Sequence, residues 1–159
     1  MELPSPLAVF PVRGFCYSGG MGDTSHSRAC LDRWYDYILQ SHDKRILWDM
    51  LHPDVVFESP VVHTPQTGRD ITFKYLASAD KVLGGEGFRY VGEWLNEDGA
   101  VLEFTNTLDG IAVNGIDMIK FDDQGKIIHF KVMVRPLKAV NQVQQLMKAQ
   151  LEAMAGAKS

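Results

Sequence analysis

The sequence predicts an α+β fold in which a curved antiparallel sheet wraps around three N-terminal helices, with a further helix at the C-terminus. Two observations carry this prediction. Apolar residues recur at helical spacing between residues 23 and 83, whereas they alternate with polar residues between 87 and 135. Helices followed by consecutive antiparallel strands are typical of folds whose helices cover one face of a sheet. A sheet that curls around its helices encloses a cone with an apolar interior.

Composition narrows the class of protein. The chain has 159 residues, 45% of them hydrophobic, which is enough for one compact domain with a core. Its 16 basic and 20 acidic residues give a net charge of −4 with no basic block, so we expect no nucleic-acid partner. No apolar run reaches membrane-spanning length, so we expect no membrane partner. Cys16 and Cys30 form neither a disulfide framework nor a metal-ligand spacing. We therefore expect no metal, no cofactor and a cytoplasmic location.

Three segments are expected along the chain. Residues 1–22 are rich in Pro and Gly and lack the apolar core of a signal peptide, which predicts a flexible N-terminal arm. Residues 23–136 form the folded domain, and residues 137–159 form the C-terminal helix, which Pro136 opens.

The helices and the first strand are predicted from spacing and end signals. The first helix runs from about Asp23 to Gln40, and the second follows Asp43, which caps it. A short strand at 55–59 ends before Pro60. The third helix runs to about Leu83, where Gly84 and Gly85 end it. The first helix places these residues on one face: Leu31, Trp34, Tyr35 and Ile38.

The alternating region predicts a run of antiparallel strands. Phe88, Tyr90 and Trp94 fall on one face of the first of these strands. Two later dipeptides, Asp109-Gly110 and Asn114-Gly115, both signal turns. We interpret Asp109-Gly110 as the hairpin turn and Asn114-Gly115 as a bulge.

Asp117 is the residue that raises a functional question. It lies between Ile116 and Met118 and shares a strand face with Ile119 and Phe121. A carboxyl group on an apolar face must be paired, protonated or active in chemistry. A register slip of one residue would turn Asp117 to solvent instead.

The last strand, 126–135, has apolar residues on both of its faces. Phe130, Val132 and Val134 lie on one side, and Met133 lies on the other with His129 and Lys131. A sheet that is apolar on both faces needs a second cover. We therefore expect a homodimer that forms across the outer face.

The order of these elements resembles the nuclear transport factor 2-like superfamily. The similarity lies in Phe57-Glu58-Ser59-Pro60, in Gly68-Arg69-Asp70 and in the run from Gly115 to Ile127. Within it, the SnoaL-like polyketide cyclases and the Δ5-3-ketosteroid isomerases are the most similar groups. The resemblance implies a cystatin-like α+β cone and a pocket for a small hydrophobic ligand. It also implies dimerisation across the outer face of the sheet.

The isomerases of this superfamily imply roles for individual positions. Asp117 falls where they keep a protonated aspartate as one oxyanion donor, and Tyr35 falls where they use a tyrosine as the second. Their general base precedes the proline, and that position is Ser59, which cannot take a carbon-bound proton at neutral pH. His63, in the loop after Pro60, is the candidate replacement base.

Two hypotheses follow for function. In the first, the chain is an isomerase-like or cyclase-like enzyme for an apolar carbonyl compound, with Tyr35 and Asp117 as donors and His63 as base. In the second, it is a non-catalytic ligand-binding or dimerisation module of the same fold. The expected pocket also contains substrate-binding residues, namely Phe57, Ser59, Trp94, Phe121, Phe130, Val132 and Val134.

Overall fold

The computed structural model describes residues 22–156. Almost all of the predicted N-terminal arm, and the last three residues of the predicted C-terminal helix, therefore lie outside the described residues. The elements, in chain order, are α1 (Ser25–Asp36), η1 (Tyr37–Ser41), α2 (Lys44–Met50), β1 (Leu51–Glu58), β2 (Gln66–Thr67), α3 (Arg69–Leu83), β3 (Arg89–Asn96), β4 (Gly99–Leu108), β5 (Ile111–Phe121), β6 (Ile127–Arg135) and α4 (Leu137–Gly156).

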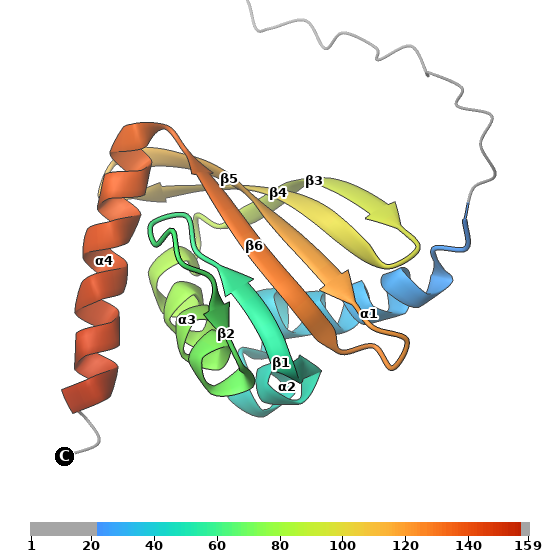
Figure 1. Cartoon of the computed structure of the whole chain (residues 1–159). Helices are drawn as coiled ribbons and strands as arrows, with labels where there is room; N and C mark the ends of the chain where they lie inside the picture. Colours follow the sequence, from blue (N-terminus) through green and yellow to red (C-terminus); the bar gives the residue numbers. More distant parts are fainter. Residues whose placement is uncertain (1–21, 157–159) are drawn as a thin grey trace, which may run out of the picture.

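The six strands form one sheet in the order β2-β1-β6-β5-β4-β3. All neighbouring pairs are antiparallel except β1 and β6, which run parallel. This exception follows from topology, because the helix α3 and four strands, β2 to β5, separate β1 from β6 along the chain. The long strands β4, β5 and β6 form the middle of the sheet (Figure 1).

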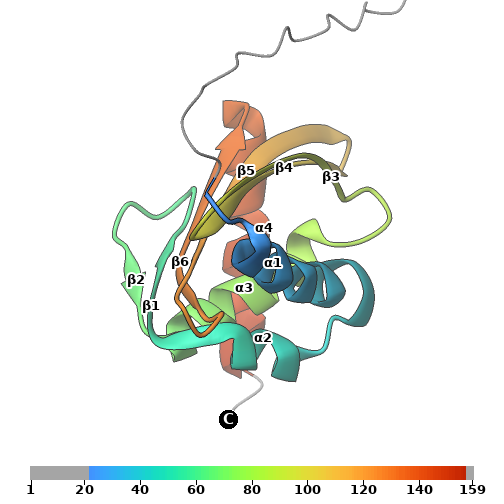
Figure 2. The ribbon, with the colours of Figure 1, turned by 90° about the vertical axis from the view of Figure 1, so that its right-hand side faces the viewer.

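The sheet is curved, and α1 and α3 lie on its concave side (Figure 2). Two hydrophobic clusters fill the space between these layers. One is centred on α1, α2 and the middle of the sheet and contains Leu31, Trp34 and Phe130. The other joins α3 and α4 to the strand ends and contains Phe104 and Val143. The predicted fold class, an α+β cone with a C-terminal helix, is confirmed.

The helix ends follow the local sequence. The Asp43 side chain accepts a hydrogen bond from the backbone N–H of Arg45 at 2.9 Å, so the predicted cap of α2 is confirmed. The first helix ends in a π-helical turn, η1. The next residue, His42, has a left-handed backbone conformation. Short π segments of this kind often accompany functional sites.

Trp94 does not share a face with Tyr90, which corrects the sequence prediction. Tyr90 pairs with Phe104, but Gly92 pairs with Glu103, so one extra residue bulges from β3 between them. A bulge of one residue exchanges the two faces for the rest of the strand. Trp94 therefore lies on the outer face with 58% of its surface exposed.

The predicted bulge at Asn114-Gly115 is also wrong. β4 and β5 pair without interruption from Gly99–Lys120 to Leu108–Ile111, so the hairpin turns only at Asp109-Gly110. Gly115 has a packing role instead. A Cβ atom there would lie 2.4 Å from the ring of Phe104 and 2.6 Å from the backbone oxygen of Met133.

We predict that Gly115→Ala destabilises the domain by about 1–3 kcal/mol, because overpacking a filled core forces neighbouring groups to move. Urea denaturation followed by circular dichroism measures this change. Gly156→Ala is the control, since nothing lies within 4 Å of a Cβ there and its backbone is outside the left-handed region. An unchanged midpoint for Gly115→Ala would show that the sheet relaxes freely around Phe104.

The C-terminal helix α4 stands beside α3 and the ends of β5 and β6 (Figure 1). Its inner face buries Ala139, Val143 and Met147. The side chain of Gln142 donates to Asp109 Oδ2 at 2.6 Å, which ties the helix to the β4–β5 turn. The helix therefore covers one end of the cone.

Candidate functional site

Asp117 lies on the inner face of the sheet, with only 7% of its surface exposed. Its cross-strand partners are Leu102 on β4 and Val132 on β6. The alternation along β5 therefore directs the carboxyl group into the cone, as the sequence pattern indicates. Burial raises the pKa of this carboxyl to about 7, although a hydrogen bond from Tyr90 opposes the shift.

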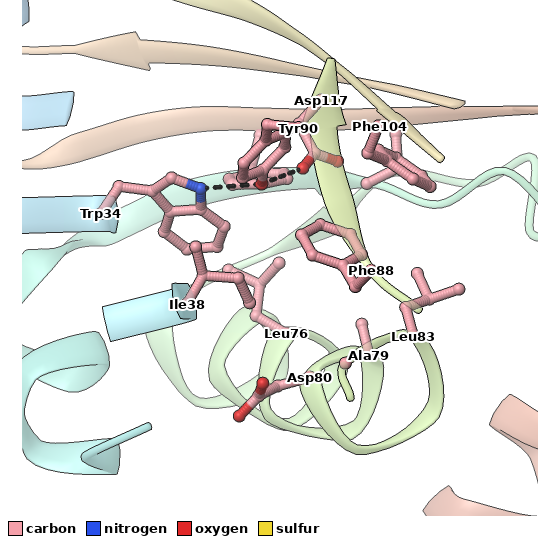
Figure 3. A pocket seen from close by; sticks show the side chains of 13 residues that line it. Trp34, Ile38, Leu76, Ala79, Asp80, Leu83, Phe88, Tyr90, Phe104 and Asp117 are labelled. Atoms are coloured by element: carbon pink, nitrogen blue, oxygen red, sulfur yellow. Dashed lines mark hydrogen bonds between the residues drawn. The ribbon is translucent and has the colours of Figure 1, made fainter. Parts of the chain in front are cut away.

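A chain of two hydrogen bonds ends at this carboxyl (Figure 3). The indole N–H of Trp34 donates to the hydroxyl oxygen of Tyr90 at 3.0 Å. The Tyr90 hydroxyl in turn donates to Asp117 Oδ2 at 2.7 Å. An indole nitrogen can only donate, so the Tyr90 proton is directed to Asp117. Burial and the adjacent carboxyl raise the pKa of Tyr90 well above its ordinary value, which keeps it a donor.

The bond from Tyr90 to Oδ2 is the one hydrogen bond that the Asp117 carboxyl group makes among residues 22–156, and its other oxygen, Oδ1, takes no part in it. The side chain borders a cavity of about 40 Å³. The cavity wall is mainly apolar and comes from α1, η1, α3 and four strands. The lining residues are Trp34, Ile38, Leu76, Ala79, Asp80, Leu83, Gly84, Phe88, Tyr90, Phe104, Asp117, Phe130 and Val132.

This volume has room for a few water molecules, since one water occupies about 10–15 Å³ on this scale. An organic ligand therefore has to move part of the wall. Phe88 follows the segment Gly84–Gly87, which contains three glycines, and its ring packs on Tyr90 and Phe104 at centroid distances of 5.0 and 5.5 Å. Phe88 is therefore an aromatic wall residue that directly follows a glycine-rich segment.

A second carboxyl group, Asp80 on α3, lies across the cavity from Asp117 (Figure 3). His42 contacts Asp80 Oδ1 through Nδ1 at 2.9 Å. The Tyr37 hydroxyl donates to Asp80 Oδ2 at 3.3 Å. These bonds connect η1 to α3 on the side of the cavity opposite the sheet.

The structure does not bring Tyr35 to the cavity. Its hydroxyl donates to Glu93 Oε2 at 2.6 Å, and the same carboxylate pairs with Arg28 near the surface. The reason is helical rotation, because Trp34, one residue earlier, occupies the buried face of α1. Tyr35 instead packs behind Tyr90, with ring centroids 5.6 Å apart.

His63 and Ser59 also lie away from Asp117. They border a separate recess of about 300 Å³ beside the end of β6, together with Glu58 and Lys131. The Ser59 hydroxyl accepts a hydrogen bond from the backbone N–H of Val61 at 3.2 Å. Val132 borders both the cavity and this recess.

The predicted wall residues divide into three groups. Phe130 and Val132 line the cavity. Phe57 and Phe121 are buried in the core and do not line it, because their rings pack against other core side chains. Trp94 is on the outer face, and Val134 borders the recess that contains His63.

Sequence reasoning missed Tyr90 and Trp34 as partners of Asp117. The alternation places Tyr90 on one face with Phe88, but its position beside Asp117 depends on the register of β3 on β4 and of β4 on β5. Within residues 22–156, no group of three His, Cys, Asp or Glu side chains is arranged to hold a metal ion. No described helix is long and apolar enough to cross a membrane.

A family model described as the SnoaL-like domain matches residues 31–130. The chain belongs to this family. The SnoaL-like domain also has structural neighbours with nuclear transport factor 2-like folds, so the predicted superfamily is confirmed. No curated protein matches the chain.

Three solved structures similar to this SnoaL-like domain are informative. A steroid delta-isomerase from Pseudomonas aeruginosa is 33% identical, with 83% of this chain and 96% of that chain covered and a TM-score of 0.77. An uncharacterised protein with a cystatin-like fold from Silicibacter pomeroyi is 25% identical, with coverages of 79% and 87% and a TM-score of 0.71. A putative ketosteroid isomerase from Kribbella flavida is 17% identical, with coverages of 72% and 81% and a TM-score of 0.57, which shows the fold alone.

We predict that Asp117 makes the domain less stable as pH rises from about 4 to 7. The folded state holds a proton on Asp117 up to a pKa of about 7, whereas the unfolded state releases it near 3.8. The folded state therefore binds more protons in this window, and the free energy of unfolding falls by on the order of 4 kcal/mol across it.

Asp117→Asn removes this contribution while keeping the shape of the side chain. Urea unfolding at several pH values from 4 to 8.5 gives the difference between the two proteins. The wild type should lose stability relative to Asp117→Asn as pH rises. Parallel pH profiles for the two proteins would show that Asp117 ionises as freely in the folded state as in the unfolded chain.

Proposed function

We propose that this domain binds a small, apolar, neutral carbonyl compound, and that the protonated carboxyl of Asp117 donates a hydrogen bond to the carbonyl oxygen. One observation carries the proposal, namely the free Oδ1 of a buried acid at an apolar cavity. A pKa near 7 leaves a large share of the acid protonated at neutral pH. The 33% identity to a steroid delta-isomerase supports a carbonyl ligand.

The same hydrogen bond gives the site a chemical capability. A donor placed at a carbonyl oxygen stabilises the negative charge that develops when the carbonyl becomes an enolate. Losing one such donor typically costs about 3–4 kcal/mol of transition-state stabilisation. An isomerase-like or cyclase-like reaction is therefore the finer form of the proposal, with Asp117 as the donor.

A second candidate function is ligand binding without catalysis. The observation that favours it is the position of the predicted base, because His63 borders a different recess from Asp117. The two candidates differ in what Asp117→Ala does. Catalysis predicts a far larger loss in turnover of a β,γ-unsaturated ketone than in its affinity. Binding alone predicts that no conversion to the conjugated enone is seen by ultraviolet absorbance.

We predict that cyclohexanone binds more weakly as pH rises through 7, because only protonated Asp117 donates to it. Tyr90→Phe removes a hydrogen bond that lowers the Asp117 pKa, so this variant should move the midpoint of the decline to higher pH. Isothermal titration calorimetry between pH 6 and 8.5 measures both effects.

Tyr35→Phe is the matched comparison, because its hydroxyl is bonded to Glu93 outside the cavity. We expect it to leave the midpoint where it is. A shift in Tyr35→Phe and none in Tyr90→Phe would contradict the assignment of Tyr90, rather than Tyr35, as the hydrogen-bond partner of Asp117. A pH-independent affinity would remove Asp117 from the binding site.

We also propose that two copies pair through the outer face of the sheet. Trp94 and Met133 are 58% and 51% exposed on this face, and Met133 lies opposite Ile116 on β5. A second copy would cover these side chains and leave each inner face to the helices. The resemblance to the nuclear transport factor 2-like superfamily implies dimerisation through the same surface.

We predict that Trp94→Glu shifts the protein from dimer to monomer at micromolar concentration, because a buried unpaired carboxylate opposes association. Size-exclusion chromatography with light scattering gives the mass. Leu137→Glu is the control, since Leu137 is 74% exposed at the start of α4 rather than on the sheet. A monomeric wild type would contradict the proposal.

A further inference from the structure

The ionisable side chains that line the cavity are all acidic. Among the described residues that line it, the ionisable side chains are Asp117, Asp80 and Tyr90, and none is Lys, Arg or His. Tyr90 remains neutral because its pKa is raised well above the ordinary value. The charges that the lining residues can carry are therefore negative, although Asp80 has a basic partner in His42, which is not among the lining residues. An anionic ligand would have to enter against both carboxyl groups.

Asp117 lacks a basic partner on each element packed against it. α1 and η1 present Trp34 and Ile38, and β4 and β6 present apolar side chains, among them Phe104. β3 presents the Tyr90 hydroxyl, and α3 presents Asp80. Asp80 in turn contacts the His42 imidazole through Oδ1 and accepts a hydrogen bond from the Tyr37 hydroxyl through Oδ2. Behind Tyr90, the Tyr35 ring leads to Glu93, and the basic side chain there, Arg28, is paired with that carboxylate.

Aromatic rings surround the space beside this carboxyl group. The rings of Trp34 and Phe130 contact each other at a tilt on one side, with centroids 5.0 Å apart. Phe88 packs on Tyr90 and Phe104 on another. Aromatic faces attract organic cations, and the attraction strengthens when water is excluded. A buried carboxylate without a basic partner, next to several aromatic rings, is the arrangement that complements a positively charged apolar group.

We propose that the cavity also takes a small hydrophobic amine in its protonated form, whose ammonium group pairs with Asp117 Oδ1 while its carbon skeleton contacts the aromatic rings. This inference rests on the proposed function, because the amine would bind in the same cavity as the carbonyl compound. It adds a second class of ligand for that cavity. The neutral carbonyl compound uses the protonated acid, whereas the ammonium ion uses the carboxylate. The two ligand classes therefore have opposite pH dependence.

The test compares three probes with the same ring: cyclohexylammonium, cyclohexanone and cyclohexanecarboxylate. An alkylammonium stays protonated between pH 6 and 8, so only the protein titrates. The ionised fraction of a group with a pKa near 7 rises from about one tenth to about nine tenths over this range. Calorimetry should show cyclohexylammonium binding about tenfold tighter at pH 8 than at pH 6. Cyclohexanone should weaken by about the same factor, and the carboxylate should not bind.

Asp117→Asn is the matched variant, because it removes the charge but keeps an N–H donor for a carbonyl oxygen. It should abolish cyclohexylammonium binding and make cyclohexanone binding independent of pH. Asp80→Asn removes the second negative charge and should weaken cyclohexylammonium but not cyclohexanone. Both variants are compared with the wild type in urea unfolding, so that a loss of folding is recognised.

The outcomes separate the two proposals. If cyclohexanone binds and cyclohexylammonium does not, or if Asp117→Asn binds the cation as the wild type does, the inference is overturned and the carbonyl site stands. If only the cation binds, the carbonyl proposal fails and the inference stands. Phe88→Ala provides a wider cavity for the same probes. If neither probe binds the wild type or this variant, both proposals are overturned.

Discussion

The burial of one carboxyl group, that of Asp117, is the constraint on which the site depends. An acid in apolar surroundings is costly when charged, so it must gain hydrogen bonds or a proton. The fold supplies a single hydroxyl from Tyr90, which Trp34 orients by donating to it. It supplies no positive charge among the lining residues. The result is an acid that changes its charge close to neutral pH.

Several packing features hold this arrangement in place. The uninterrupted register between β4 and β5 puts Asp117 opposite Leu102 on the inner face. Residues four apart in a regular strand share a face. Because of the bulge in β3, Tyr90 points inward whereas Trp94, four residues later, points outward. Gly115 makes room for the ring of Phe104, which forms part of the cavity wall. The small cavity is therefore a product of close packing in the sheet as well as of the helices that cover it.

The fold could be predicted well from the sequence because apolar residues repeat every 3.6 residues in one part of the chain and every 2 residues in another. It also placed Asp117 inward, since alternation alone determines its face once Ile119 and Phe121 are taken as core. The failures have local physical causes. One residue of helical rotation separates Trp34, which reaches the site, from Tyr35, which does not. One inserted residue turns Trp94 outward. Neither the rotation of α1 nor the inserted residue in β3 can be recognised from the pattern of a single sequence.

The loop residues were the hardest to place. Ser59 and His63 lie close to Asp117 in the family-based reading, but the chain after β1 carries them to a recess at the other side of β6. Loop paths depend on contacts made after the core has formed, so spacing along the chain does not determine them. The partnership of Tyr90 and Asp117 joins residues 27 positions apart and likewise required the strand register.

The position of Trp34 also gives the protein an internal optical reporter. Its indole is 3% exposed and donates to the first hydroxyl of the chain that ends at Asp117, whereas the indole of Trp94 is in contact with solvent on the opposite face of the sheet. A soluble quencher that reaches Trp94 is shielded from Trp34 by the core. The fluorescence that survives quenching therefore includes the emission of a ring in the cavity wall, and its wavelength responds to polarity there.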